Sequence, residues 1–403
     1  MTETLKPETM EQLLGAIAWA AGDGQSFDVR GLSTKQGFGR PVEATRVLDL
    51  GGLAGITAYE PSELYMTALA ATSIAEIKAA LRQNNQQMSF EPPDMSVLYG
   101  GGEGGSIGGA IACNLAGPRR IQAGAARDHF LGFNAVSGRG EIFKSGGTVV
   151  KNVTGFDLSK LLAGSFGTLA VMHQVSFKVM PAAEKTRTVL VLGLDDAQAM
   201  TAMAAALGSA NEVSGAAHLP ADAAARSGVS YVSGAGGAVT AIRVEGPGPS
   251  VEHRCGALTN MLKEFGAIEE LHSQNSSALW REICDAGGFL DDGPVWRLSV
   301  APMDGAGVAE TILAETEGRI FYDWGGGLVW LGLTNSDDNS KMIRKAVAAV
   351  GGHATLIRAD AEMRTTTPVF EPQPGPLRDL TARVKNSFDP KGVLNPGRMV
   401  EGV

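Results

Sequence analysis

Residues 100–112 read GGGEGGSIGGAIA, the densest cluster of glycine in a chain that contains 53 glycines. Glycines 100, 102 and 105 match the GxGxxG spacing of dinucleotide-binding folds. That motif requires a helix directly afterwards, then a strand, and an acidic residue about 20 positions on. The residues that follow, Asn114-Leu-Ala-Gly-Pro-Arg-Arg120, predict no helix–strand unit. The spacing therefore argues against a Rossmann fold, and the stretch is better interpreted as a loop that cradles a phosphate group.

Two further segments share this character. Residues 30–39, RGLSTKQGFG, follow a predicted strand at 27–30, and their hydroxyls and backbone N–H groups suit a pyrophosphate, although an ordinary surface turn is the alternative. In residues 151–169, glycines flank a short predicted helix whose ends can meet a ligand, with helix capping as the alternative. No GxxxxGK[ST] motif occurs, so a P-loop is excluded.

Composition limits the partners of this chain of 403 residues. Its net charge of −9 argues against nucleic acid, which requires a basic face. The three cysteines, at 113, 255 and 284, form no CxxC pair, so local spacing supports neither an iron–sulfur cluster nor a zinc site. No signal-peptide core opens the sequence, and no apolar run reaches about 18 residues. We expect a cytoplasmic protein that reaches a membrane only through partners.

The sequence pattern changes at Pro181. Before it, strand and turn signals are interrupted by the glycine-rich segments, and a predicted helix at 8–22 opens the chain. Ser73 and Glu76 have the spacing of a capping box at the start of another helix. After Pro181, strand-like and helical runs alternate with a spacing that predicts antiparallel sheets covered by helices. We expect domains at 1–181 and 182–370, followed by a C-terminal segment at 371–403.

Taken together, the glycine-rich segments resemble the FAD-binding domain of the vanillyl-alcohol oxidase/PCMH flavoenzymes. The likeness runs in order through residues 30–37, 48–50, 67–76, 104–109, 127–128, 151–157 and 164–169. The C-terminal motif FDPKGVLNPG at 388–397 is similar to the 2-hydroxy-acid branch of that superfamily. Within the branch, the chain most resembles the short FAD-binding subunits, or E subunits, of glycolate oxidases.

The resemblance implies an α+β fold: a PCMH-type FAD-binding domain of two α+β subdomains, plus an antiparallel-sheet cap domain covered by helices. Loop 31–39 and stretch 104–112 would hold the pyrophosphate through backbone N–H groups, and the cap would shape a substrate pocket. The residues implied to bind FAD are Arg30, Gly31, Ser33, Thr34, Gly37, Gly104, Gly105, Ser106, Ile107, Gly108, Gly109, Asn114, Asn152, Gly155, Asp157 and Asn395.

Departures from the family pattern refine this picture. Some relatives attach FAD covalently through a histidine in the first loop, where this chain has Leu32-Ser33-Thr34, so we expect noncovalent FAD. Larger relatives carry a histidine-rich cap segment, whereas the six histidines here show no metal-ligand spacing, and we expect no bound metal. A substrate carboxylate calls for a guanidinium, and Arg297, on a predicted cap strand, is the catalytic-site candidate, with a salt bridge at the edge of the core as the alternative.

The implied function is oxidation of glycolate, or another 2-hydroxy acid, to glyoxylate by the FAD-binding subunit of a multi-subunit oxidase. A larger FAD-binding subunit and an iron–sulfur subunit are the expected partners, because this chain lacks cluster ligands. Two alternatives stay open: a non-catalytic flavin-binding assembly or electron-relay subunit, and a stand-alone FAD-dependent 2-hydroxy-acid dehydrogenase.

Overall fold

The computed structural model describes residues 3–100, 104–149, 155–290, 293–335 and 337–401. Its contacts divide the chain into two compact units. Unit 1 comprises Met1–Ala116, Gly124–Pro181 and Pro368–Val403, and unit 2 comprises Gly117–Ala123 and Ala182–Thr367. The C-terminal residues are thus part of unit 1, and the short segment Gly117–Ala123 clusters with unit 2.

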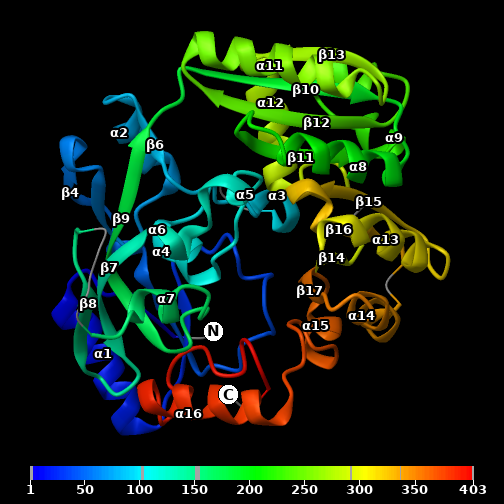
Figure 1. The fold of residues 1–403 in the computed structure, drawn as a ribbon. Coiled ribbons are helices and arrows are strands. Elements are labelled where there is room, and N and C mark those ends of the chain that lie inside the picture. The colour runs from blue at the N-terminus through cyan, green and yellow to red at the C-terminus, as the bar shows by residue number, and fades with distance from the viewer. Residues whose placement is uncertain (1–2, 101–103, 150–154, 291–292, 336, 402–403) are drawn as a thin grey trace. The chain divides into compact units, whose positions relative to one another are not determined.

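Unit 1 contains a six-stranded sheet in the order β4-β5-β9-β7-β8, with β6 paired to β9 (Figure 1). All of its pairings are antiparallel, and the long strand β9 pairs with β5, β6 and β7. The strands are β4 (Ile56–Glu60), β5 (Tyr65–Leu69), β6 (Gln86–Met88), β7 (Phe130–Ser137), β8 (Ile142–Gly146) and β9 (Ala170–Pro181).

A second sheet in unit 1 is small and parallel. Its order is β1 (Thr4–Leu5), β3 (Arg46–Asp49) and β2 (Phe27–Arg30). Helix α1 (Met10–Asp23) begins at its N-cap Thr9 and ends at Gly24, whose φ of 65° is the left-handed conformation that favours glycine. Its buried residues join those of β2 and β3 in one apolar cluster. The two sheets, each with its own core cluster, correspond to the two expected α+β subdomains.

Local sequence explains where the helices of unit 1 begin. The Ser73 hydroxyl accepts a hydrogen bond from the Glu76 N–H and caps α2 (Ile74–Arg82), as the capping-box spacing predicts. Ile74, Ile77 and Leu81 then lie on one face and enter the core. The remaining helices of the unit are α3 (Ser96–Tyr99), α4 (Ile107–Cys113), α6 (Ala126–His129), α7 (Leu158–Leu162) and α16 (Gly375–Phe388).

Unit 2 is built on one eight-stranded, fully antiparallel sheet in the order β13-β10-β12-β11-β15-β16-β14-β17 within the described residues. Strands β11 and β16 are buried along their whole length, so both of their faces are covered. The strands are β10 (Lys185–Leu192), β11 (Val213–Leu219), β12 (Val239–Gly246), β13 (Ala267–His272), β14 (Val295–Ser299), β15 (Gly318–Asp323), β16 (Leu328–Leu333) and β17 (His353–Arg358).

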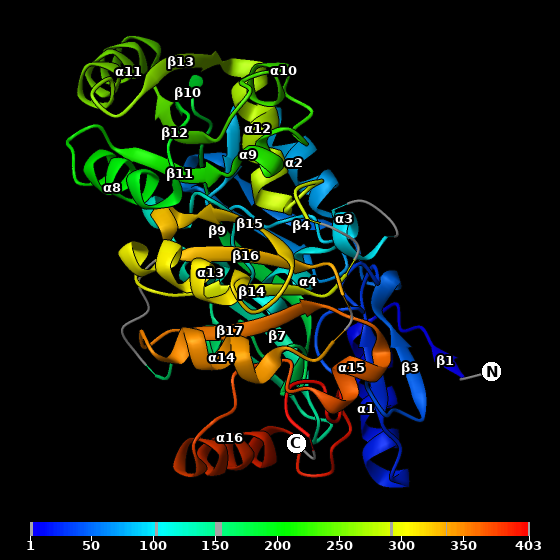
Figure 2. The same ribbon diagram turned by 90° about the vertical axis from the view of Figure 1, so that its right-hand side faces the viewer.

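Helices cover the sheet of unit 2. Figure 2 shows α11 (Gly248–Leu262), α8 (Asp196–Leu207), α13 (Gly305–Leu313) and α14 (Ser340–Ala348) in a row along one face, where they contact the strands and one another. The other helices are α5 (Arg120–Ala123), α9 (Ala221–Ala224), α10 (Ser230–Ser233), α12 (Ser273–Asp285) and α15 (Ala361–Thr366). This arrangement confirms the predicted α+β fold with an antiparallel, helix-covered second domain. Across the described residues, no helix is both long and apolar enough to cross a membrane.

Candidate FAD site

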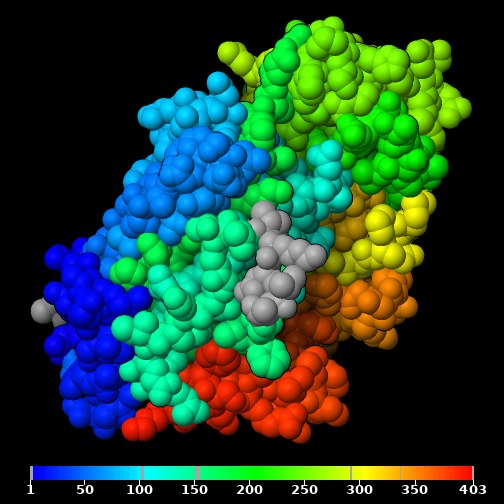
Figure 3. Space-filling view, turned by 60° about the vertical axis from the view of Figure 1, so that its left-hand side comes forward, coloured from blue at the N-terminus to red at the C-terminus, as the bar shows by residue number. Residues whose placement is uncertain are grey.

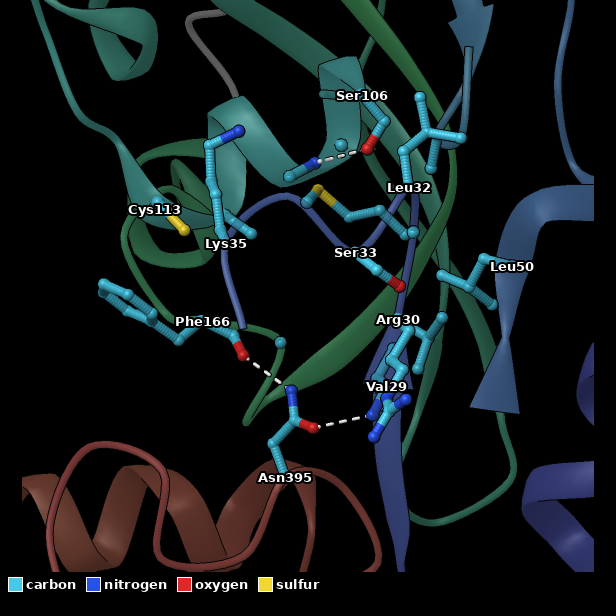
Figure 4. Close-up of a pocket in the computed structure, with 18 of the residues that line it drawn as sticks. Val29, Arg30, Leu32, Ser33, Lys35, Leu50, Ser106, Cys113, Phe166 and Asn395 are labelled. Atoms are coloured by element: carbon cyan, nitrogen blue, oxygen red, sulfur yellow. Dashed lines mark hydrogen bonds between the residues drawn. The ribbon is translucent and has the colours of Figure 1, made fainter. Parts of the chain in front are cut away.

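A cavity of about 120 Å³ lies within unit 1, where segments far apart in the sequence meet (Figure 4). Strand β2 and the loop after it form one wall, α4 and the turn before it form a second, and the start of β9 and the C-terminal residues close it. The lining residues are Asp28, Val29, Arg30, Gly31, Leu32, Ser33, Thr34, Lys35, Gln36, Leu50, Ala70, Ser106, Gly108, Gly109, Ala112, Cys113, Phe166, Gly167, Ala170, Val171, Met172, Asn395 and Arg398.

The loop after β2 is folded tightly against α4. A Cβ added at Gly31 would lie 2.8 Å from the Ser106 hydroxyl, so the two glycine-rich segments approach each other too closely for a side chain. Ser33 has a φ of 61°, in the left-handed region that non-glycine residues rarely adopt. Such strain is characteristic of residues held in place for function, and Phe166 and Asn395 on the same cavity share it.

Helix α4 begins directly after the glycines, where the sequence pattern predicted no helix. The Ser106 hydroxyl caps it by accepting a hydrogen bond from the Gly109 N–H at 3.2 Å. Gly108 donates to the Ala70 carbonyl at 2.8 Å, and an added Cβ would lie 2.7 Å from that oxygen. The packing of α4 on Ala70, the residue after β5, therefore requires a glycine at position 108. Gly109 has only the Ser106 hydroxyl nearby and borders the cavity.

Asn395 joins two walls of the cavity from the C-terminal segment. Its Oδ1 accepts a hydrogen bond from the Val29 N–H at 2.7 Å, and its Nδ2 donates to the Phe166 carbonyl at 2.7 Å (Figure 4). The residue is 3% exposed; its bond to Phe166 is buried and its bond to Val29 is partly buried. Because both backbone groups would lose their partner without the amide, Asn395 fixes β2 relative to the loop at Phe166.

Two cations at one end of the cavity, Lys35 and Arg398, are not among the residues that the sequence pattern indicated. The Lys35 ammonium lies 3.5 Å from the Thr34 hydroxyl, and the Arg398 guanidinium donates to the Lys35 carbonyl at 2.9 Å. Burial lowers the pKa of Arg398. Cys113 borders the same end, and burial raises its pKa although both cations oppose that change. Lys35 lies within the glycine-rich loop at 30–39, and its positive charge there was the feature of the sequence that could have indicated it.

The structure brings together about half of the sequence-predicted cofactor residues. Those that line the cavity are Arg30, Gly31, Ser33, Thr34, Ser106, Gly108, Gly109 and Asn395. Arg30 also pairs with Asp28 at 2.7 Å. The residues that do not line it are Gly37, Gly104, Gly105, Ile107 and Asn114. Gly155 and Asp157 line a separate cavity beside Arg127 and Lys160, and Asn152 lies outside the described residues.

The predicted residues away from the cavity have structural partners that explain their positions. A Cβ on Gly37 would collide with the Tyr99 ring. Gly104 and Gly105 have φ values of 74° and 67°, which shape the turn before α4. Ile107 is fully buried in the core, and the Asn114 side chain accepts a hydrogen bond from the Arg127 N–H at 3.0 Å. These contacts support the loops that carry the cavity residues.

Arg297 occupies β14 of unit 2, as the strand pattern predicts. Its guanidinium lies 4.8 Å from the centroid of the Trp324 ring, and Arg120 lies 4.4 Å from the same ring. Burial and, to a smaller extent, the neighbouring charge of Arg120 lower the pKa of Arg297 to about 10, although Asp323 opposes the change. Within the described part of the chain, neither guanidinium donates a hydrogen bond, so their N–H groups are available to an anion.

The residues of the unit 1 cavity fit FAD. One end is apolar, with Leu50, Val171 and Met172, whereas the glycine-rich loops and two cations suit a diphosphate. Asp28 adds a buried carboxylate oxygen, Oδ1, that has no hydrogen-bond partner within the described residues. An acceptor in that position suits a cofactor that carries hydroxyl and amino donors.

Comparison with known proteins agrees with this fit. A family model described as "FAD binding domain" matches residues 3–146. The glycolate oxidase subunit GlcE of Escherichia coli (strain K12) is 32% identical over 391 residues, which cover 96% of this chain and 97% of that protein. The glycolate oxidase subunit GlcD of Bacillus subtilis (strain 168) is 37% identical over 103 residues, or 26% and 21% of the two chains.

A structural match supports the fold independently. The crystal structure of p-cresol methylhydroxylase with substrate bound gives a TM-score of 0.70 at 15% identity, and the match covers 99% of this chain and 88% of that one. The chain therefore shares the fold of p-cresol methylhydroxylase, and its sequence similarity shows an FAD-dependent oxidoreductase. Within that class, the chain belongs to the family of the glycolate oxidase subunit GlcE, because the similarity extends over nearly the full length of both proteins.

Proposed function

We propose that this chain is the FAD-binding subunit of a glycolate oxidase, a 2-hydroxy-acid oxidoreductase that converts glycolate to glyoxylate. The full-length similarity to GlcE carries this proposal. The matching segment of GlcD supports assembly with a larger FAD-binding subunit of related sequence. We also propose an iron–sulfur partner, since the cysteines at 113, 255 and 284 are scattered and form no CxxC pair that could hold a cluster by local spacing. Any association with a membrane would then depend on these partners.

The residues of the cavity would bind and orient the cofactor. When bound, FAD supplies the acceptor for the hydride that leaves the α-carbon of a hydroxy acid. Loop 31–36 and the turn at Ser106 would hold the diphosphate, and Lys35 and Arg398 would offset its charge. Asn395 would hold β2 and the loop at Phe166 at a fixed distance, so that the cofactor binds in one defined geometry.

Arg297 would bind the substrate carboxylate. Its planar guanidinium is oriented by stacking on Trp324 and has donors free for a two-point interaction. Arg120, stacked on the same ring, adds a second positive charge that attracts an anion. A monocarboxylate such as glycolate or lactate would supply the negative charge that these two arginines attract, and a neutral alcohol would not.

A second candidate function is electron relay, with glycolate oxidised by the larger FAD-binding subunit. One observation favours it: no histidine is among the described residues that line the cavity. The best-buried histidine, His218, is instead held between Thr240 and Asp196 in unit 2. A relay subunit needs bound flavin but no base for the hydroxyl proton.

Anaerobic reduction separates the two candidates. The purified chain, loaded with FAD, is mixed with glycolate or lactate while the visible absorbance of the flavin is followed. Bleaching by the isolated chain, at the rate of the assembled complex, indicates a self-sufficient hydroxy-acid dehydrogenase. Bleaching only in the complex supports the multi-subunit oxidase. A variant complex in which the larger subunit cannot bind FAD then shows whether this chain's flavin accepts the hydride directly.

A further inference from the structure

Lys385 and Asp389 form a buried ion pair at the end of α16. Their charged atoms are 2.7 Å apart, and the side chains are 6% and 0% exposed. The Lys385 ammonium also donates to the carbonyls of Thr168 at 2.7 Å and Leu394 at 2.9 Å, so all three of its protons are used. Burial lowers the pKa of Lys385, whereas Asp389 raises it. A buried pair is costly unless fully bonded, and this one is fully bonded.

The pair acts on backbone rather than on other side chains. Asp389 accepts hydrogen bonds from the Val393 N–H at 2.9 Å and the Leu394 N–H at 2.8 Å. It thereby closes the turn that follows α16. Gly138, in the turn between β7 and β8, leaves room for this carboxylate, because an added Cβ would overlap its atoms. Figure 3 shows the C-terminal residues, in red, beside that hairpin, where Arg139 donates to the Ser387 carbonyl at 2.8 Å.

This turn presents Asn395 to the FAD cavity. Val393 and Asn395 exchange backbone hydrogen bonds with Phe27 at 2.7 and 2.9 Å, which extends the small sheet at β2. Thr168, the other partner of Lys385, lies two residues beyond Phe166, to which Asn395 is bonded. Lys385 therefore contacts both the turn that carries Asn395 and the loop that Asn395 joins to β2.

We infer that Lys385 and Asp389 are positioning residues for FAD: they fix Asn395, and through it the distance between β2 and the Phe166 loop. Neither residue lines the cavity. The pair acts at a distance from the cofactor, and its loss loosens the cavity wall. Loss of the pair should therefore weaken FAD binding, and this weakening should require the Asn395 amide. Any loss of stability is a separate effect.

The experiment measures the FAD dissociation constant of each apo-protein by fluorescence titration, well below its unfolding temperature. For Lys385→Met we expect binding weaker by about 10-fold to 100-fold, the range for loss of charged, buried hydrogen bonds. Lys391→Met is the matched control, because Lys391 lies in the same segment and bonds a backbone carbonyl, that of Ala21, at 2.6 Å. Its FAD affinity should stay within about threefold of wild type, a change below 0.7 kcal/mol.

A double-mutant cycle with Asn395→Ala distinguishes positioning from plain stability. In the Asn395→Ala background, Lys385→Met should weaken FAD binding less than about threefold further, while still lowering the unfolding temperature. Gly138→Ala displaces Asp389 without removing a charge, and it replaces Lys385→Met if that variant does not fold. Full additivity in the cycle, or equal losses in Lys385→Met and Lys391→Met, would overturn the inference. The inference would also be overturned if Gly138→Ala and Lys385→Met, each measured separately, both left the FAD affinity unchanged.

Discussion

The FAD cavity of unit 1 and the arginine cluster of unit 2 hold their polar groups in opposite ways. In the cavity, Asn395 uses both ends of its amide on backbone atoms, and Arg398 is bonded to the Lys35 carbonyl. In unit 2, Arg297 and Arg120 rest on the Trp324 ring, and within the described residues neither guanidinium donates a hydrogen bond. The Asn395 and Arg398 side chains of the cavity are therefore held in place by hydrogen bonds. The guanidinium N–H groups of Arg297 and Arg120 instead stay available to a ligand.

The difference fits two kinds of ligand. A cofactor that stays bound through many turnovers gains from a rigid site, because little entropy remains to be lost when it binds. A substrate that must enter and leave is served by a charged group that is oriented yet not already paired. Other arginines of unit 2 strengthen the contrast. Arg119 binds Glu245 through two hydrogen bonds, and Arg243 binds Ser214. Charge alone therefore does not distinguish Arg297 from these arginines, whereas its lack of a hydrogen-bonding partner among the described residues does.

The largest expected effect concerns how the cofactor is held. Heat or acid should release all of the FAD into the supernatant, because the loop that carries a linking histidine in some relatives has Leu32-Ser33-Thr34 here. Cys113 is the cysteine that lines the cavity, and its raised pKa keeps it as the unreactive thiol. The measurement is flavin absorbance in the precipitate and the supernatant. Yellow protein after precipitation would refute noncovalent binding, and Cys113→Ser would then show whether that sulfur is the link.

The second prediction tests the wall formed by α4. Gly109→Val should weaken FAD binding by at least roughly 100-fold, about 2.7 kcal/mol, because Gly109 borders the cavity and an added Cβ would also lie 3.2 Å from the Ser106 hydroxyl. Gly108→Val is expected to abolish FAD binding as well, partly by disrupting packing on Ala70. Gly256→Val, in α11, is the control, since its Cβ position meets nothing within 4 Å. A folded Gly109→Val protein with normal flavin content would remove Gly109 from the site.

The third prediction tests whether the donors of Arg297 serve a substrate. Arg297→Lys keeps the charge but loses the planar pair of donors, so the KM of the assembled oxidase for glycolate should rise roughly tenfold with unchanged FAD content. Arg344→Lys is the matched control: Arg344 also stacks on a tryptophan, Trp296 at 5.3 Å, but bonds the Ala354 carbonyl. An unchanged KM in Arg297→Lys, or equal changes in both variants, would exclude Arg297 from carboxylate binding.

The fourth prediction concerns stability and tests the paired arginines of unit 2. Burial raises the pKa of Glu245, but Arg243 and Arg119 outweigh it and hold that pKa below its usual value of 4.5. The pair therefore stabilises the fold fully above about pH 4.5, and this contribution is lost as the pH falls through the lowered pKa. Arg119→Met should cost about 2 kcal/mol at pH 7 and flatten the decline in acid.

Thermal unfolding across pH 3 to 7, by circular dichroism, checks the last prediction. Arg319→Met is the control, because Arg319 pairs with Asp222 at 2.6 Å while both side chains remain partly exposed. Its unfolding temperature should change little, as expected for a surface pair. If Arg119→Met unfolded at the wild-type temperature at every pH, the paired arginines would contribute nothing measurable to unit 2.

Much of the fold was readable from local sequence. The helical pattern at 8–22, the capping-box spacing before α2 and the strand pattern at Arg297 predicted elements that the structure contains. The pattern also changes at Pro181, where a segment of unit 1 ends. These features depend on residues only a few positions apart, because capping hydrogen bonds and hydrophobic periodicity are both local patterns in the sequence. The family likeness of the glycine-rich segments then gave the cofactor, because few folds require glycine at so many separate turns.

Only the tertiary structure decided which predicted residues share one cavity. Gly108 and Gly109 are adjacent in sequence, yet one is fixed by the Ala70 carbonyl and the other borders the ligand space. Asp157 belongs to a different cavity, while Lys35 and Arg398 meet across more than 360 positions. The ion pair of Lys385 and Asp389 has an ordinary i, i+4 spacing, typical of an exposed helix. Its burial, and hence its role, follows from long-range packing that local sequence does not encode.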